Sequence, residues 1–459
     1  MLDKALTHAA ENRETFLDQL VEFLRIPSVS TLPEHQPDVE RAAQWLAANM
    51  AAAGIKNVQV LPTAGHPIVY GDWLDAGSNA PTVLVYGHYD VQPADPLDLW
   101  DTAPFEPTIR DGEIYARGAS DDKGQAFLHV KAVESMLAAN GSLPVNVKFL
   151  FEGEEEIGSK HLEPFVLSQK ELLAADSVVI SDSRILSADQ PSIVYALRGL
   201  TYMELHVSGP GKDLHSGVYG GSIHNPAQAL AEIIASLHDD NGSISIPGFY
   251  DKVRDLSEEE RDALAQVPYP IEQWQKETGF DTPWGETEFT ILERVSARPT
   301  CEVNGIWGGF QGEGGKTVIP ARAGAKISMR LVADQDPDEI AELFTKHIER
   351  IAPTTVNVEV HTLSTGWGAI TPIDAPEMHA AAKAYEATWG VPPVFTREGG
   401  SIPIVAVFQR ELNAPVVLMG FGLDDNIHSP NEHFRLENYY RGIDTVIHYF
   451  HLLAQPAVA

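Results

Sequence analysis

The sequence predicts an α/β domain, built on a mostly parallel sheet with helices on both faces, that is interrupted by an inserted α+β domain. Two patterns predict this organisation. Short apolar runs alternate with segments of helical apolar spacing over residues 1–198, and the alternation resumes over residues 363–459, as in parallel sheets. Between them, residues 199–362 contain strands with alternating apolar and polar residues, which is typical of antiparallel sheets with one exposed face.

The first part of the larger domain alternates predicted helices with predicted strands. Apolar spacing predicts helices at residues 2–24, 38–53, 123–139 and 161–173. Short apolar runs predict strands at residues 58–61, 68–70, 83–86, 145–151 and 178–181. Residues 90–110 are rich in Pro and Asp and indicate a surface loop.

The inserted domain and the end of the chain are predicted in the same way. In the insertion, strands are expected at residues 202–207, 325–332 and 356–360, and helices at residues 226–237 and 337–351. After it, helices are expected at residues 375–389 and 438–453, with a buried strand at residues 416–419. No internal repeat is evident.

Composition excludes some classes of partner. The formal net charge of -33 argues against nucleic acid and anionic membranes, since both require basic patches. The single cysteine, Cys301, rules out an intramolecular disulfide and favours a reducing compartment. The N-terminus predicts an amphipathic helix instead of a leader, and no apolar run is long enough to span a bilayer. A cytoplasmic protein is therefore expected.

Five residues have the chemistry and the placement of metal ligands. They are His88, Asp121, Glu156, Asp182 and His428. The first four follow or end short apolar runs that predict buried strands, and open α/β sheets build their sites at such strand ends. Two imidazoles and three carboxylates suit zinc or manganese, and carboxylates this dense would repel one another without bound cations. The set predicts a two-metal hydrolase.

Each motif taken alone has an ordinary structural explanation as well. His88 and Asp90 are compatible with a turn, and the acids Asp121 and Asp122 with the start of a helix. The run Glu154 to Glu156 is compatible with a solvated surface. In a hydrolase, Asp90 would orient the His88 ring and Asp122 would cap the helix or orient a neighbour. Adjacent acids could divide the work, with Glu156 as ligand and Glu155 as general base.

With these motifs together, the chain resembles the metallopeptidase family of carnosinase-like dipeptidases, aminoacylases, acetylornithine deacetylase and succinyl-diaminopimelate desuccinylase. The resemblance runs from about His88 to Phe434 and is most specific for the carnosinase-like dipeptidase branch. It is carried by Tyr86–Pro93, Arg117–Gly124, Glu155–Ser159, Lys212–Gly217, Lys316–Pro320, Arg397–Pro403 and His428–Glu432.

The resemblance implies a complete set of metal ligands. Asp121 would bridge two divalent metal ions per subunit, with zinc foremost and manganese or cobalt as alternatives. His88 and Asp182 would complete one shell, and Glu156 and His428 the other. The peptide bond after Asp121 would be cis. Glu155 would be the proton shuttle, although the neighbouring Glu154 leaves some ambiguity that the Gly158-Ser159 offset resolves in favour of Glu155.

The resemblance also implies how substrate is bound. The inserted domain would be a lid that also forms a homodimer, and Arg330 would pair with the terminal carboxylate of a small peptide. Thr317, Gly400 and Ser401 would add hydrogen bonds to that carboxylate. His215 would reach across the dimer and stabilise the developing oxyanion in the neighbouring site.

The predicted activity is hydrolysis of small dipeptides. The nearest alternative is removal of an acetyl, succinyl or carbamoyl group from an amino acid by the same machinery. A non-catalytic protein on this fold would be expected to lack a ligand or the base, and none is missing. A phosphatase would be expected to carry a basic, Gly-rich phosphate cradle, which the sequence lacks.

Overall fold

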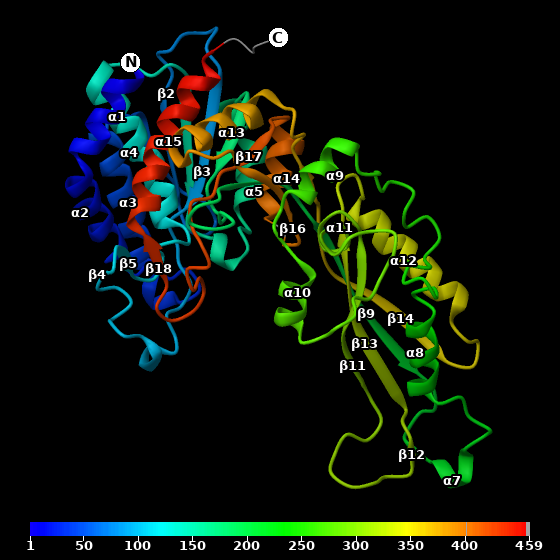
Figure 1. The fold of residues 1–459 in the computed structure, drawn as a ribbon. Helices are drawn as coiled ribbons and strands as arrows, with labels where there is room; N and C mark the ends of the chain where they lie inside the picture. The colour runs from blue at the N-terminus through cyan, green and yellow to red at the C-terminus, as the bar shows by residue number, and fades with distance from the viewer. Residues whose placement is uncertain (401, 456–459) are drawn as a thin grey trace. The chain divides into compact units, whose positions relative to one another are not determined.

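The chain folds into two compact units (Figure 1). The computed structural model describes residues 1–400 and 402–455. Unit 1 comprises residues 1–195, 371–396 and 407–459, and unit 2 comprises residues 196–370 and 397–406. Unit 2 is thus wider than the predicted insertion, residues 199–362, and it includes residues 397–406, which were expected in the larger domain. One reason is local pairing, since β15 (Ala369–Ile370) bonds to Ala196 and Leu197.

Unit 1 is built on a nine-stranded sheet whose centre is parallel. Its order is β1-β2-β6-β3-β7-β17-β8-β15, with β16 beside β8, and β15 and the last two residues of β8 and of β16 belong to unit 2. Parallel pairing joins β3 to both β6 and β7, and β7 to β17, whereas the outer pairs are antiparallel. The strands are β1 (Lys56–Leu61), β2 (Ile68–Trp73), β3 (Thr82–His88), β6 (Asn146–Glu152), β7 (Ser177–Ile180), β8 (Ser192–Leu197), β16 (Val394–Glu398) and β17 (Val416–Leu418).

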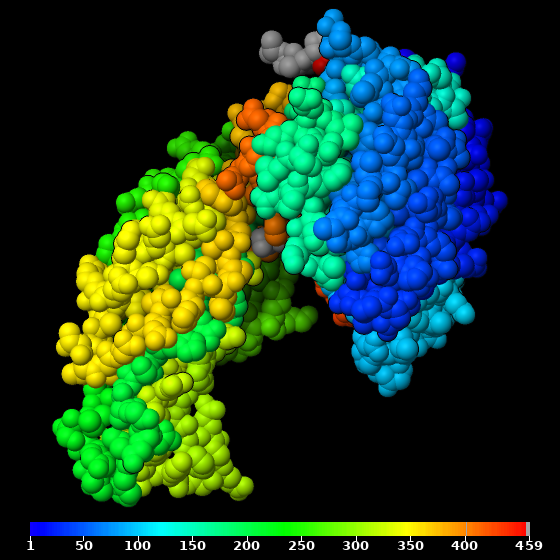
Figure 2. Space-filling view, turned by 180° about the vertical axis from the view of Figure 1, so that it is seen from behind, coloured from blue at the N-terminus to red at the C-terminus, as the bar shows by residue number. Residues whose placement is uncertain are grey.

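Helices cover this sheet, as the sequence predicted. They are α1 (Leu2–Glu11), α2 (Arg13–Leu24), α3 (Gln36–Ala52), α4 (Lys123–Asn140), α5 (Leu162–Ser168), α6 (Lys170–Leu173), α13 (Pro376–Trp389) and α15 (Leu436–Leu453), whereas α14 (Pro403–Val407) belongs to unit 2 except for its last residue. Helix α4 packs on β3 and on α15 (Figure 1). The edge strand β1 is partly exposed. Figure 2 shows the N-terminal segments of unit 1 in blue. The mostly parallel α/β fold is confirmed.

Two predicted helices are each divided in the structure. The helix expected at residues 2–24 breaks at Asn12, whose side-chain amide donates to the carbonyl of His8 at 2.8 Å and caps the end of α1. The helix expected at residues 161–173 breaks at Gln169, between α5 and α6. Because apolar spacing continues across both breaks, the pattern alone does not reveal them.

A small sheet that the sequence pattern missed ties the end of the chain to the N-terminal half. Its strands are β4 (Thr108–Arg110), β5 (Glu113–Tyr115) and β18 (His433–Arg435), in the order β18-β5-β4. Strand β18 pairs with β5 antiparallel, with Phe434 opposite Ile114. This pairing joins segments about 320 residues apart and brings the loop that carries His428 to the start of α4.

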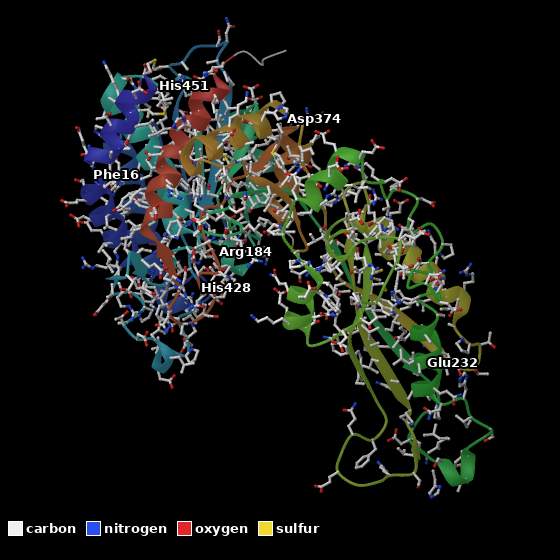
Figure 3. All side chains as sticks on the ribbon, viewed as in Figure 1. Phe16, Arg184, Glu232, Asp374, His428 and His451 are labelled. Carbon is white, nitrogen blue, oxygen red and sulfur yellow. The ribbon has the colours of Figure 1, made fainter. Side chains whose placement is uncertain are left out.

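Unit 2 is a four-stranded antiparallel sheet with helices packed on one face. Its order is β11-β13-β9-β14, and its strands are β9 (Gly199–Ser208), β11 (Thr300–Gly308), β13 (Arg322–Leu331) and β14 (Asn357–Gly366). Odd-numbered residues of β9 are buried against α8 (Pro226–Ala235) and α12 (Pro337–Ile351), whereas His206 on the other face is exposed. Figure 3 labels Glu232 on α8. Unit 2 therefore has the α+β pattern predicted for the insertion.

The remaining elements of unit 2 are short. They are β10 (Leu214–His215), β12 (Val318–Ile319), α7 (Ser216–Tyr219), α9 (Glu258–Ala265), α10 (Ile271–Thr278) and α11 (Ile291–Ser296). Cys301 is buried in the core under the sheet. Among the residues that the structure describes, no helix has both the length and the apolar character needed to cross a bilayer.

Candidate metal centre

The candidate site of unit 1 lies at the carboxyl ends of its central strands. Strand β3 ends at His88, β6 ends just before the short helix at Glu155–Ile157, and β7 ends two residues before Asp182. Asp121 lies two residues before Lys123, where α4 starts. Because the carboxyl ends of neighbouring parallel strands meet at one edge of a sheet, these side chains converge there.

The five predicted ligands form two groups of three that share one carboxylate. One group is His88, Asp121 and Asp182, and the other is Asp121, Glu156 and His428; in each, the ligand atoms lie within 4.8 Å of one another. His88 Nε2 is 3.1 Å from Oδ1 of Asp121, and His428 Nε2 is 2.9 Å from its Oδ2. The two oxygens of Asp121 therefore face different groups, as a carboxylate that bridges two ions must.

Asp90 fixes the orientation of His88 and of the segment that follows β6. Its backbone carbonyl oxygen lies 3.1 Å from Nδ1 of His88 and its Oδ1 lies 3.4 Å from the same nitrogen, on the side of the ring away from Asp121. Its two oxygens accept hydrogen bonds from the backbone N–H groups of Glu155 and Glu156, at 3.2 and 3.1 Å. Acceptor oxygens on the second ring nitrogen, here the backbone carbonyl and the carboxylate of Asp90, fix the tautomer that leaves Nε2 free for a metal.

Glu432 holds the backbone that carries Asp121. Its buried carboxylate accepts four hydrogen bonds: from Arg117 Nη1 at 2.7 Å, Gly118 N at 2.9 Å, Ser120 N at 3.0 Å and Asp121 N at 3.1 Å. The position of Asp121 thus depends on a side chain more than 300 residues away. The residue lies in the segment His428–Glu432, but no role for it was predicted from the sequence.

Two further contacts position Glu156 and His428. Gln92 donates from Nε2 to Oε2 of Glu156 at 2.8 Å, a contact that the sequence did not suggest. His428, labelled in Figure 3, has a φ of 58°, a left-handed conformation that non-glycine residues adopt rarely and mostly at functional sites. Its Nε2 lies 3.2 Å from Oε2 of Glu156.

Asp122 orients a neighbour but does not cap the helix. It is the N-cap residue of α4, yet its side chain makes no capping hydrogen bond. Instead its Oδ2 accepts from the backbone N–H of His88 at 3.2 Å. The peptide bond between Asp121 and Asp122 is cis, as the resemblance implied. Through its hydrogen bond to the end of β3, the side chain of Asp122 supports the first ligand.

The structure distinguishes between the three consecutive glutamates. The carboxylate of Glu154 is engaged by Nδ1 of His161 at 2.8 Å and by the backbone N–H of His66 at 3.0 Å. That of Glu155 has no hydrogen-bond partner among the described residues. Burial and the nearby charges of Glu156 and Asp121 raise the pKa of Glu155 to about 7. A carboxyl group with this pKa can both accept and release a proton near neutral pH.

The electrostatics of the group fit a cation. Burial and the charge of Asp121 raise the pKa of Asp182 well above its usual value. Burial lowers the pKa of His88, but hydrogen bonds to Asp121 and Asp90 outweigh it and raise the pKa well above its usual value. The three carboxylates of the two groups therefore carry more negative charge than the two histidines can neutralise. Two imidazoles and three carboxylates at this spacing form a donor set suited to two divalent ions.

In unit 2, the predicted substrate-binding residues fall into two places. His215 and Thr317 lie together, because Ser216 N donates to the carbonyl of Thr317 at 3.1 Å and β10 pairs with β12. Arg330 lies near the far end of β13, eight residues beyond Arg322, or about 26 Å away at 3.3 Å per residue. Gly400 belongs to unit 2 as well, whereas Ser401 lies outside the described residues.

Comparisons with known proteins identify the family of the chain. The model of the peptidase family M20/M25/M40 matches residues 84–451. The chain is 34% identical to the Cys-Gly metallodipeptidase dug1 of Schizosaccharomyces pombe, over 99% of this chain and 98% of that protein. It is 33% identical to the human Beta-Ala-His dipeptidase, over 99% and 93%.

Solved structures are similar over the whole chain. The M20 family metallo-carboxypeptidase Sso-CP2 from Sulfolobus solfataricus superposes with a TM-score of 0.80 at 36% identity, covering 96% of this chain and 99% of that one. The structure of human carnosine dipeptidase 1 has a TM-score of 0.74 at 32% identity and covers 99% of both chains.

Proposed function

The chain belongs to peptidase family M20/M25/M40, and from this premise we propose how it works as a metal-dependent dipeptidase. The observation that carries the proposal is the pair of ligand groups that share Asp121, next to the unpaired carboxyl group of Glu155. His88, Asp121 and Asp182 would hold one ion, and Asp121, Glu156 and His428 the other. When bound, the two ions lower the pKa of a water molecule and polarise the scissile carbonyl group.

Glu155 moves the proton. It takes a proton from the attacking water and then gives it to the amine nitrogen of the leaving amino acid, so that it ends the reaction in its starting state. Its raised pKa suits both steps. Asp90 supports the reaction indirectly, since its carboxylate holds both the ring of His88 and the backbone of Glu155.

The residues of unit 2 bind the substrate. Arg330 pairs with the terminal carboxylate of the dipeptide, with Gly400 and Ser401 adding hydrogen bonds. His215 and Thr317 are too far from Arg330 within unit 2 to serve the same site, and we assign them to the active site of the second copy in a homodimer. There His215 stabilises the oxyanion. We also expect zinc, manganese or cobalt as the metal, and a cytoplasmic location.

Small dipeptides are the expected substrates, because the dipeptidase relatives are named for Cys-Gly and for Beta-Ala-His. Hydrolysis of N-acyl amino acids is the alternative, since such substrates present the same terminal carboxylate. Release of a C-terminal residue from longer peptides is a second one, motivated by the similarity to a metallo-carboxypeptidase.

A substrate panel tests the proposal. Protein stripped with a chelator is refilled with zinc, manganese or cobalt and assayed with Cys-Gly, β-Ala-His, Ala-Leu, N-acetylleucine and a tripeptide. Dipeptide cleavage that returns only with metal is the expected result. Cleavage confined to N-acetylleucine would move the enzyme to the deacylases, and cleavage confined to the tripeptide would move it to the carboxypeptidases. E155Q, which keeps all five ligands, is the matched inactive control.

A further inference from the structure

Arg198 is a partly buried arginine for which unit 2 supplies too few partners. It lies between β8 and β9, and its Nε and Nη1 atoms are buried without a hydrogen-bond partner. Glu302 attracts it through the electric field alone, without a hydrogen bond. Buried N–H donors without an acceptor destabilise the fold, so the presence of two of them on Arg198 calls for an explanation other than stability.

A second arginine, Arg330, lies beside it. Arg330 pairs across the sheet with Leu200, two residues along the chain from Arg198. Burial and then the charge of Arg330 lower the pKa of Arg198 to about 10, which shows that the two cations repel each other. Within the described part of unit 2, neither cation forms an ion pair. Two adjacent cations without an anion between them attract a negatively charged ligand.

The third nitrogen of Arg198 lies against the segment that carries Gly400. A Cβ atom at Gly399 would come within 2.6 Å of Nη2 of Arg198, so the guanidinium group approaches the backbone where no side chain intervenes. The start of this segment is anchored separately, by an ion pair between Arg397 and Glu260. Arg198 thus touches the turn to which carboxylate binding was assigned and lies beside the arginine that would bind the carboxylate.

We propose that Arg198 is a second cation of the carboxylate subsite, which positions the Gly399–Gly400 turn and strengthens the binding of substrates with a free C-terminal carboxylate. The proposal rests on the proposed function and extends it to substrate selection. Arg330 contacts the carboxylate, while Arg198 acts through its charge and through the turn that it supports. Because the carboxylate is remote from the bond that breaks, the interaction is made equally in the ground state and the transition state. Loss of Arg198 therefore raises KM and leaves kcat nearly unchanged.

The test compares three variants on two substrates. R198Q removes the charge, R198K keeps it, and R322Q removes the same charge from an exposed position at the other end of β13. Each metal-loaded full-length protein is assayed with Ala-Leu and with its amide, Ala-leucinamide, which lacks the carboxylate. For R198Q we expect KM for Ala-Leu to rise about 10- to 100-fold, the usual effect of losing an interaction with a charged group. Its kcat/KM for the amide should stay within about twofold of the wild-type value.

The controls separate this role from a structural one. R198K is expected to restore most of the affinity for Ala-Leu, and R322Q to behave as the wild type on both substrates. An unchanged KM in R198Q, or an equal loss on both substrates, would overturn the proposal. If the wild type cleaves N-acetylleucine instead of Ala-Leu, the proposed function fails, and the same comparison is made with N-acetylleucine and its amide. If the wild type cleaves none of these, the failure lies with the proposed function and not with Arg198.

Discussion

The substitution E432Q is expected to weaken both the fold and the metal centre. The amide keeps the shape of the side chain but replaces one carboxylate oxygen with an N–H₂ group, which donates. Each oxygen of Glu432 accepts two hydrogen bonds. In either orientation of the amide, its N–H₂ group therefore faces two N–H donors and can accept a hydrogen bond from neither. Hydrogen bonds to a charged group contribute about 1.5–3 kcal/mol each, so two lost bonds cost about 3–6 kcal/mol. Breaking one partner of a buried ion pair gives a similar figure, about 3–5 kcal/mol.

Urea unfolding, followed by circular dichroism on metal-free protein, measures this change. The matched control is E437Q on α15, because the ion pairs of Glu437 with Arg435 and Arg441 are largely exposed, and we expect a change of at most about 1 kcal/mol. Since Glu432 holds the backbone of Asp121, we also expect metal affinity to fall about 10- to 100-fold in a chelator competition assay. Unfolding of E432Q at the urea concentration of the wild type, together with unchanged metal affinity, would refute the reasoning.

Three further predictions concern Glu155, His215 and His129. E155Q should lower kcat by about 10²- to 10⁴-fold while metal content measured by mass spectrometry stays at the wild-type level; loss of metal would contradict the role of Glu155 as a base. H215A should lower kcat by about 10²- to 10³-fold, and random mixing of H215A with E155Q subunits should restore up to about a quarter of the wild-type activity, because half of the dimers then hold one complete site. No recovery after mixing would argue against action in trans. Burial lowers the pKa of His129 to about 3. Below about pH 6.5 this histidine is therefore protonated in the unfolded chain but still neutral in the folded protein. Stability should fall by about 1.4 kcal/mol per pH unit as pH drops from 6.5 toward 3, and H129Q should lack this part of the loss in unfolding experiments across that range.

Local patterns in the sequence located most of the site. His88, Glu156 and Asp182 follow short apolar runs, and parallel strands bring their carboxyl ends to one edge of the sheet. The structure accordingly gathers them with Asp121 and His428 into two groups around a shared carboxylate. The same patterns predicted the α/β fold, because alternating strand and helix periodicities are properties of neighbouring residues.

Features that depend on distant residues were not visible in the sequence. The four hydrogen bonds of Glu432 and the pairing of β18 with β5 join segments hundreds of residues apart. The domain boundaries shifted for the same reason, since β15 pairs with Ala196 and Leu197, the first residues of unit 2.

By itself, the sequence determined which chemical groups this protein offers and at which strand ends they stand, because residue type and periodicity are local properties. The tertiary structure decided which of these groups act together. It showed that Glu154 is already engaged while Glu155 is not, that Thr317 lies with His215 and far from Arg330, and that Arg198 lies beside Arg330. Such relations are set by packing and strand register over long separations in the chain, and no short segment of sequence encodes them.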